Sequence, residues 1–181
     1  NSSDFGKYEL LPRYLVDISS IDTTTHVMDS DLSFPVICSP TGMSRLFHAE
    51  GELAVAQAAA EIGTLYTLST LSTFSIEDVA GVSKGDKWFQ IYVFKDRSLI
   101  SEFMDRCRDA GYKGLSLTID VPTQGNRERD IRNGLAIPPS IGLRSAFGFL
   151  LKPMWCYDYL TSDRFQLANV SHKAPVDSRD L

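Results

Sequence analysis

Short apolar runs alternate with helix-like segments along the chain, and this alternation limits the fold more than any other feature. The apolar runs occupy residues 34–40, 64–70, 88–94 and 114–120. Segments with apolar residues at helical spacing separate them, at 51–63, 75–82 and 98–111. Strands and helices that alternate at this interval form right-handed βαβ units in a parallel sheet. The sequence therefore predicts an α/β protein.

The helical segments carry their own boundary signals. Ser75 stands at an N-cap position, and acidic residues follow it in the first turn. Gly63 and Gly111 close the other two helical segments, where glycine commonly ends a helix. These signals agree with the assignment made from the spacing of apolar residues.

Each apolar run acquires polar residues at its C-terminal end. These residues are Thr41, Ser69, Thr70, Gln90, Tyr92, Thr118 and Asp120. In a (β/α)8 barrel the C-terminal ends of the strands carry the chemistry. A doubly wound sheet, the alternative, concentrates polar groups at one switch point and commonly carries a glycine-rich phosphate turn. The sequence contains no such turn, so the barrel is favoured.

The chain is short for a complete barrel of this kind. A TIM barrel has eight βα units and typically about 250 residues, whereas these 181 residues show a βα pattern only as far as Asn133. The remaining residues contain no further segment with a strand pattern. We therefore expect the first four βα units of a barrel followed by a long insertion.

Composition and charge exclude several classes of protein. The net charge of −5, with no cluster of Lys and Arg, argues against a broad nucleic-acid surface. No apolar run approaches the roughly 20 residues of a membrane-spanning helix. The three cysteines are far apart and odd in number, and the three histidines form no HxH or HxxxH pair, so neither a disulfide framework nor a metal site is expected. We expect reduced thiols in a cytoplasmic protein, and the lack of an initial Met suggests a processed or partial chain.

Five blocks of sequence together resemble one enzyme family. They occupy residues 11–25, 39–42, 67–70, 88–93 and 117–134, and include the motifs SPTG, WFQIYV and LTIDVPTQGNRERDIRNG. In order and approximate spacing they are similar to the FMN-dependent α-hydroxy-acid oxidoreductases, which include lactate dehydrogenases, mandelate dehydrogenase and glycolate oxidase. The segment 137–160 resembles the one that follows strand 4 in bacterial members of the lactate dehydrogenase type.

The resemblance implies an FMN across the C-terminal mouth of the barrel. Pro40, Thr41 and Gly42 match the turn beside the reactive edge of the flavin, where glycine lets the main chain approach a flat ring. The polar residues that match the flavin ligands of the family are Ser69, Gln90 and Thr118. Hydroxyl and amide groups can donate to or accept from the ring without adding charge. The alternative for each residue is a strand-end cap exposed to solvent.

The resemblance also assigns three residues to the reaction. Tyr92 matches a tyrosine that contacts the substrate, although an aromatic core residue is its alternative. Asp120 matches a carboxylate that orients the catalytic histidine. Arg127 matches an arginine near the substrate carboxylate, while the neighbouring charges at 128–132 are expected to form a solvated ion network.

Several parts of the family's site have no match in this sequence. The family's lysine, its His-Gly-Gly-Arg motif with the histidine base and its phosphate-binding glycines all follow strand 4, and its amino-terminal tyrosine precedes the first block. His172 lacks the following glycines and is not assigned as the base. We therefore expect these 181 residues to be inactive by themselves, unless a second polypeptide supplies strands 5 to 8. Retention of FMN and oxidation of a 2-hydroxy acid by the purified segment would contradict this expectation.

The chain is expected to divide at residue 134. Residues 1–134 would form the N-terminal half of the FMN-binding barrel, and 135–181 an insertion that contacts a membrane or another subunit. Apolar and aromatic residues flank Lys152 between Ser145 and Leu160, which is the composition of an interfacial segment. Packing of this segment on its own barrel or on a neighbouring subunit is the alternative. A membrane contact would place the protein at the inner face of the membrane.

The function implied by the resemblance is oxidation of a small L-2-hydroxy acid, similar to lactate, by a homo-oligomer that is a tetramer when complete. Leu71 stands where relatives vary in side-chain size, and it suggests room for more than glycolate. A quinone, a cytochrome or oxygen remain open as electron acceptor. Another flavin-binding or phosphate-binding barrel enzyme, or a catalytically incomplete half-barrel, remain alternatives.

Overall fold

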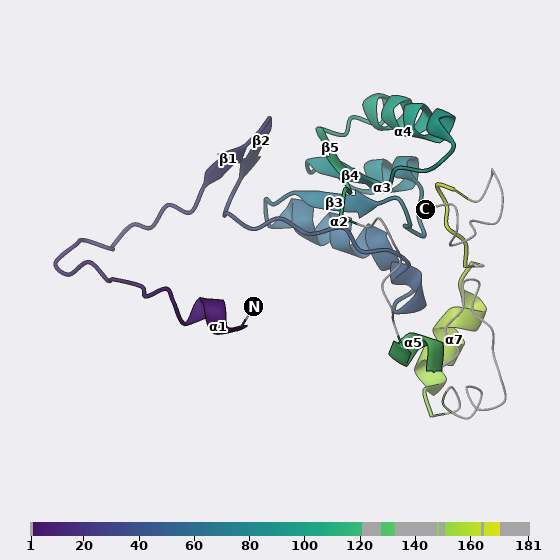
Figure 1. Ribbon diagram of the computed structural model, residues 1–181, viewed down its shortest axis with the longest axis horizontal. Coiled ribbons are helices and arrows are strands. Elements are labelled where there is room, and N and C mark those ends of the chain that lie inside the picture. Colours follow the sequence, from purple (N-terminus) through teal and green to yellow (C-terminus); the bar gives the residue numbers. More distant parts are fainter. Residues whose placement is uncertain (1, 121–127, 133–147, 149–150, 164, 171–181) are drawn as a thin grey trace.

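A parallel sheet with helices on one face forms the body of the protein. The computed structural model describes residues 2–120, 128–132, 148, 151–163 and 165–170 (Figure 1). The strands lie in the order β3 (Tyr66–Ser69), β4 (Lys87–Ile91) and β5 (Gly114–Leu117), and both neighbouring pairs are parallel. The helices that alternate with them are α2 (Gly51–Glu61), α3 (Ile76–Val82) and α4 (Arg97–Asp109). The predicted α/β class and parallel sheet are confirmed.

The apolar run at 34–40 is less regular than predicted. It lies parallel to β3 but forms a single bridge, between Cys38 and Tyr66. The Cys38 amide donates to the Leu65 carbonyl at 3.0 Å, and the Cys38 carbonyl accepts from the Thr67 amide at 3.0 Å. Pro35 and Pro40 flank this bridge and have no amide hydrogen to extend the ladder. The order of segments is therefore as expected, but the first apolar run forms a single bridge and not the regular strand that was predicted.

The predicted helix boundaries are confirmed in detail. Ser75 Oγ accepts from the Asp78 amide at 3.0 Å, and the Asp78 carboxylate accepts from the Ser75 amide at 3.1 Å. This reciprocal pair is a capping box. Gly63 and Gly111 have positive φ angles of 71° and 76°, a conformation that favours glycine at a helix end.

The core lies between the sheet and the three helices. Phe89 of β4 is fully buried, and its ring centroid lies 5.4 Å from that of Phe103 and 6.4 Å from that of Tyr112. The strand register places Leu68, Phe89 and Leu115 side by side on this face. Cys107 belongs to the same core, and burial raises the pKa of its thiol to about 12. The thiol therefore stays protonated and packs as an apolar group.

A hairpin that the sequence pattern did not reveal precedes the sheet. Its strands are β1 (Thr25–Val27) and β2 (Ser30–Leu32), each too short for a clear alternating pattern. The Ser33 amide donates to the Gly63 carbonyl at 2.8 Å, which places the hairpin near the N-terminal end of β3. His26 pairs with Asp31 within this hairpin, at 2.8 Å.

The remaining described elements lie outside the sheet. They are α1 (Ser2–Phe5), the 3-10 helix η1 (Ser44–Leu46), α5 (Glu128–Arg132) and α7 (Pro153–Thr161). The N-terminal arm, residues 2–24, extends away from the sheet, whereas α5 and α7 appear at the other side of the molecule in this view (Figure 1). Beyond residue 120, the part of the chain that is described contains no strand. None of the described helices has both the length and the apolar character needed to cross a membrane.

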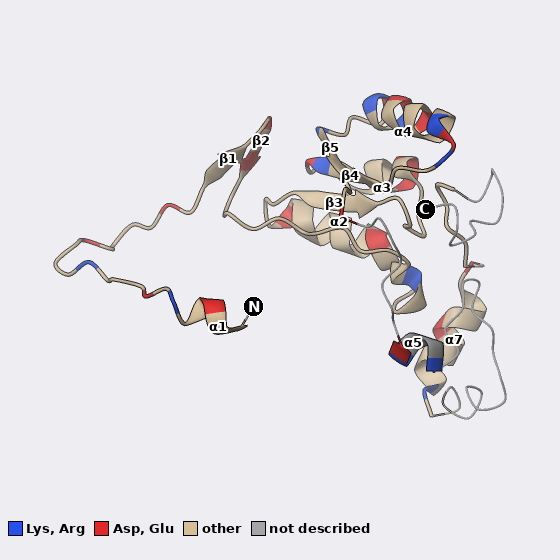
Figure 2. Ribbon diagram, viewed as in Figure 1, with Lys and Arg blue, Asp and Glu red and all other residues tan. Residues whose placement is uncertain are grey.

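Charged residues of both signs are interspersed on α4 (Figure 2). Arg106 contacts Glu77 at 2.7 Å, and Arg108 contacts Asp105 at 2.9 Å. These pairs fit the expected absence of nucleic-acid binding, which stays a prediction.

Candidate flavin site

Three polar side chains from three strands lie together at the C-terminal end of the sheet. Ser69 ends β3, Gln90 lies in β4 and Thr118 directly follows β5. The register pairs Ser69 with Gln90, and Gln90 with Ser116, two residues before Thr118. Since side chains alternate between the faces of a strand, these residues share the face opposite to the helices. In a closed barrel this face would be the interior.

Direct hydrogen bonds join the three side chains. Ser69 Oγ donates to Gln90 Oε1 at 3.1 Å, and Gln90 Nε2 donates to Thr118 Oγ1 at 2.6 Å. The Thr70 amide also donates to Gln90 Oε1, at 3.3 Å. A backbone N–H can only donate, so it fixes which end of the Gln90 amide is the oxygen. We call this arrangement the Ser69–Gln90–Thr118 row.

The row has hydrogen-bond capacity left for a ligand. The second Nε2 hydrogen of Gln90 and the hydroxyl hydrogen of Thr118 have no acceptor within the described part of the chain. Both are neutral donors, which suits the carbonyl oxygens and nitrogens of a flavin ring. Ser69 and Gln90 are each only 4% exposed, so they are not the solvent-exposed caps of the alternative interpretation. The residues present therefore fit the cofactor that the sequence suggested.

The turn after the first apolar run contacts the loop that follows β3. Pro40 and Thr41 are exposed, and Gly42 packs against Leu71, where an added Cβ would lie 3.1 Å from the Leu71 Cβ atom. The Met43 amide donates to the Leu71 carbonyl at 2.9 Å. Among the described residues, Thr41 makes no hydrogen bond with the row. Thr41 is exposed, and the expectation that it lies on one rim with Ser69, Gln90 and Thr118 stays a prediction.

The residues assigned to the reaction have different surroundings. Tyr92 follows β4, packs partly against the core, and donates its backbone amide to Thr70 Oγ1 at 3.4 Å. Its phenol has no hydrogen-bond partner in the described part of the chain. Asp120 is exposed two residues beyond Thr118 and has no described partner either. Arg127 lies outside the described residues.

Of the neighbouring charges, Glu128 and Arg132 form an exposed ion pair at 3.1 Å. This pair agrees with the solvated network expected there.

Glu52 is a site-forming residue that the sequence did not single out. It is fully buried in the first turn of α2 and its carboxylate accepts hydrogen bonds from two loops. The donors are the Ser44 amide at 3.1 Å, the Thr73 amide at 3.0 Å and Thr73 Oγ1 at 2.5 Å. Ser44 follows the 40–43 turn, and Thr73 lies in the loop after β3. Glu52 therefore ties the 40–43 turn to the loop that directly follows Ser69 of the row.

Sequence comparison supports the same cofactor. Residues 1–180 match the FMN-dependent dehydrogenase family. Glycolate oxidase 1 of Zea mays is 41% identical over 154 residues, which are 85% of this chain and 42% of that protein. Glycolate oxidase of Spinacia oleracea is 40% identical over the same shares of the two chains. The chain thus spans about two fifths of the length of the relatives it matches.

Solved structures agree with the sequence comparison. A monotopic membrane protein, (S)-mandelate dehydrogenase, has a TM-score of 0.88 and 34% identity, with 96% of this chain and 47% of that one covered. A mandelate oxidase solved with (S)-mandelic acid has a TM-score of 0.74 and 32% identity, covering 97% of this chain and 45% of that one. The extent of these matches, together with the polar row at the strand ends, shows that the chain belongs to the FMN-dependent dehydrogenase family.

Proposed function

We propose that the protein oxidises an L-2-hydroxy acid of about the size of lactate to the 2-oxo acid, with FMN as the electron acceptor at the site. The observation that carries this proposal is the Ser69–Gln90–Thr118 row, which presents neutral donors on the face of the sheet opposite to the helices. The family match and the glycolate and mandelate relatives support the reaction class. Leu71, packed against Gly42 beside the row, is the proposed determinant of substrate size.

Within this proposal, FMN supplies an acceptor for the two electrons and the hydrogen that leave the α-carbon of the substrate. Gln90 and Thr118 would donate hydrogen bonds that orient the ring, and Ser69 holds the Gln90 amide in place. Tyr92 would donate its phenol hydrogen to the substrate, and Arg127 would bind the substrate carboxylate. Asp120 would stabilise the protonated form of a histidine that takes the hydroxyl proton.

The two histidines in the described part of the chain do not suit that last role. His26 is paired with Asp31 in the hairpin, near the end of the sheet opposite to the row. His48 is exposed, and its Nδ1 atom accepts the Glu50 amide at 3.3 Å. We therefore propose that the proton acceptor is neither of these two histidines nor any residue to which a role is assigned above. Without it, the 181 residues tested by themselves are not expected to oxidise a substrate.

The proposed architecture follows the same division as the sequence. Residues 1–134 would supply the flavin-edge half of a (β/α)8 barrel, and 135–181 the insertion after its fourth strand. The complete protein would be a homo-oligomer, a tetramer, and a quinone, a cytochrome or oxygen would reoxidise the flavin.

Anaerobic mixing of the FMN-loaded complete protein, in which the 181 residues are joined by the polypeptide that supplies the proton acceptor, with substrate tests the proposed reaction. L-lactate is expected to bleach the absorption of the oxidised flavin, and D-lactate is not, because a chiral site presents one α-hydrogen to the ring. Glycolate and (S)-mandelate serve as smaller and larger comparators. A colourless protein, or a flavin that none of the L-acids reduces, would contradict the proposal.

We also propose that α7 contacts a membrane surface. Trp155 fixes the helix to the body, since its Nε1 atom donates to the Leu46 carbonyl at 2.7 Å and its ring stacks on Tyr159. Leu151 and Leu160 remain outside this contact and are each 80% exposed. Large exposed apolar residues near an anchored helix favour insertion into a lipid interface. The membrane attachment named for the mandelate dehydrogenase neighbour supports this proposal.

Flotation with vesicles of anionic phospholipid tests the membrane contact. The double variant Leu151→Gln/Leu160→Gln is expected to reduce the floated fraction several-fold, because each change removes about 2 kcal/mol of apolar burial in the lipid interface. The matched control is Leu10→Gln/Leu11→Gln, on the N-terminal arm, where both leucines are also largely exposed. Equal flotation of the two variants and the unmodified protein would exclude a role for α7.

A further inference from the structure

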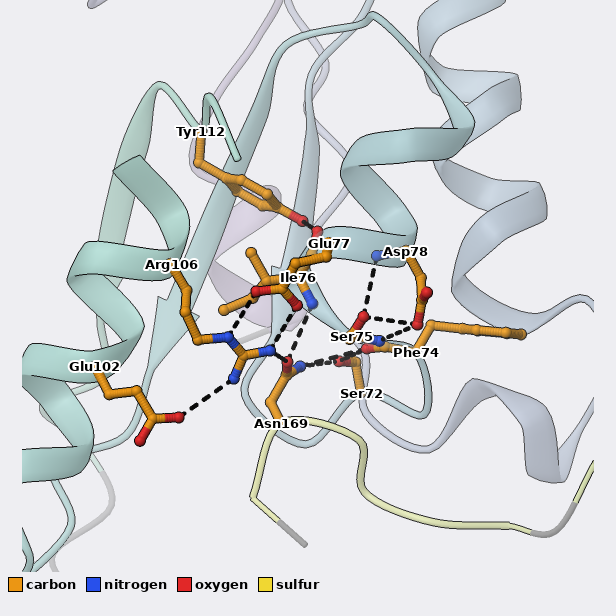
Figure 3. Close-up of polar contacts among 10 residues, drawn as sticks. All are labelled: Ser72, Phe74, Ser75, Ile76, Glu77, Asp78, Glu102, Arg106, Tyr112 and Asn169. Atoms are coloured by element: carbon orange, nitrogen blue, oxygen red, sulfur yellow. Dashed lines mark hydrogen bonds and ion pairs between the residues drawn. The ribbon is translucent and has the colours of Figure 1, made fainter. Parts of the chain in front are cut away.

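Asn169 is a fully buried polar residue far from the sheet in sequence. It lies in the described segment 165–170, which follows α7, and its side chain reaches the loop between β3 and α3 (Figure 3). This loop, residues 70–75, directly follows Ser69 and is called the β3–α3 loop below. A buried amide at this position needs hydrogen-bond partners, and the loop supplies them.

Asn169 uses both ends of its amide. Nδ2 donates to Ser72 Oγ at 2.8 Å and to the Phe74 carbonyl at 3.3 Å. Oδ1 accepts from the Ile76 amide at 3.1 Å and from Arg106 Nη2 at 3.0 Å. An asparagine side chain has two amide hydrogens and two oxygen lone pairs, so its full capacity is used. The residue therefore joins two positions of the loop, the first residue of α3 and a side chain of α4.

Arg106 holds the acceptor end of Asn169 in place. Its Nε and Nη2 atoms donate to the two carboxylate oxygens of Glu77, each at 2.7 Å, and Glu102 lies 3.6 Å from Nη1 (Figure 3). The hydrogen bonds from Arg106 lower the pKa of Glu77, so this carboxylate is charged at neutral pH. A bidentate pair of this kind restricts the guanidinium to one orientation. The segment 165–170 is thereby fastened to helices that pack on the sheet.

The β3–α3 loop in turn sets the position of the row. The Leu71 amide donates to Ser69 Oγ at 3.2 Å, and the Ser72 amide donates to the Ser69 carbonyl at 3.1 Å. The Leu71 carbonyl accepts from the Met43 amide, which belongs to the turn after the first apolar run. A shift of Ser72 would therefore move Leu71, and with it the hydroxyl that Ser69 presents to Gln90.

We propose that Asn169 is a positioning residue, which fixes the β3–α3 loop and through it holds Ser69 and Leu71 in the arrangement that binds flavin and substrate. The claim that the loop faces flavin and substrate rests on the proposed function. The claim that Asn169 fixes the loop rests on the observed contacts alone. Nothing in this role requires Asn169 to touch either ligand.

Asn169→Asp tests the inference, because it keeps the shape and the oxygen that faces Ile76 and Arg106 but removes both Nδ2 donations. Ser72→Ala removes one acceptor from the loop side and serves as the second variant. The control is Tyr112→Phe, which removes the hydrogen bond from the Tyr112 hydroxyl to the Ile76 carbonyl, 3.1 Å long, at the same end of α3. The control leaves Ser72 and Phe74 untouched.

Two measurements separate this inference from the proposed function. Hydrogen exchange at the Leu71 and Thr73 amides is expected to accelerate about tenfold in Asn169→Asp and Ser72→Ala, and less than twofold in Tyr112→Phe. The dissociation constant for FMN is expected to rise about tenfold in the same two variants. It is not expected to rise in the control Tyr112→Phe, whose thermal stability should equal theirs. Unchanged exchange, or faster exchange with unchanged FMN affinity, overturns the positioning role. An unmodified protein that binds no FMN overturns the proposed function, while the exchange data still decide whether Asn169 fixes the loop.

Discussion

Replacement of Gln90 by leucine is expected to raise the dissociation constant for FMN about 10- to 100-fold. Gln90 links Ser69 and Thr118, and it carries one of the two donors that the row has left for a ligand. Loss of one or two neutral hydrogen bonds of about 1.4 kcal/mol each corresponds to this range. Titration of the apoprotein with FMN, followed by flavin fluorescence, measures the change.

The same substitution should lower the free energy of unfolding. Leucine leaves the buried Ser69 hydroxyl without its acceptor, which costs about 1–3 kcal/mol, whereas the Thr70 amide keeps its hydrogen bond to the backbone carbonyl of residue 90. Ser116→Ala is the matched control, because Ser116 is the register partner of Gln90 and shares its face, yet makes no hydrogen bond from its side chain within the described residues. If Gln90→Leu and Ser116→Ala bind FMN equally well, the row does not hold the flavin.

Replacement of Glu52 by alanine is expected to lower the free energy of unfolding by about 3 kcal/mol or more. The Ser44 amide, the Thr73 amide and the Thr73 hydroxyl would lose a charged acceptor in a buried site. Each unsatisfied buried donor costs about 1–3 kcal/mol, which is a large share of the 5–15 kcal/mol that stabilises a typical domain. Chemical denaturation followed by circular dichroism measures the loss.

Two further variants make the Glu52 prediction specific. Glu52→Gln keeps one acceptor oxygen in nearly the same shape and should lose roughly half as much stability. Glu50→Ala, two residues earlier, removes an exposed carboxylate and should stay within about 0.5 kcal/mol of the unmodified protein. A Glu52→Ala variant as stable as Glu50→Ala would show that the two loops do not depend on this carboxylate.

The elements of the sheet and its helices could be predicted from the sequence because their signals are local. Apolar spacing located α2, α3 and α4, and Ser75 with Asp78 fixed one boundary to the residue. The same local signals placed Ser69, Gln90 and Thr118 at strand ends. In a parallel sheet those ends meet at one edge, so their proximity followed from the topology.

The residues that hold the loops could not be predicted in this way. Glu52 reads as an ordinary acidic residue in the first turn of a helix, where the helix dipole alone accounts for it. Asn169 reads as a loop residue, and its partner Ile76 is 93 residues away in sequence. Their roles depend on burial, which arises only when distant segments pack together. The place of Thr41 beside the row likewise stays a prediction, since Thr41 is exposed while its neighbour Gly42 packs against Leu71.

A crystal structure of the protein with FMN is the most direct test of the account. It is expected to show the isoalloxazine ring at the C-terminal ends of β3, β4 and β5, with Gln90 Nε2 and Thr118 Oγ1 within hydrogen-bond distance of ring atoms. A flavin bound elsewhere, with the Ser69–Gln90–Thr118 row bonded only to itself, would contradict it.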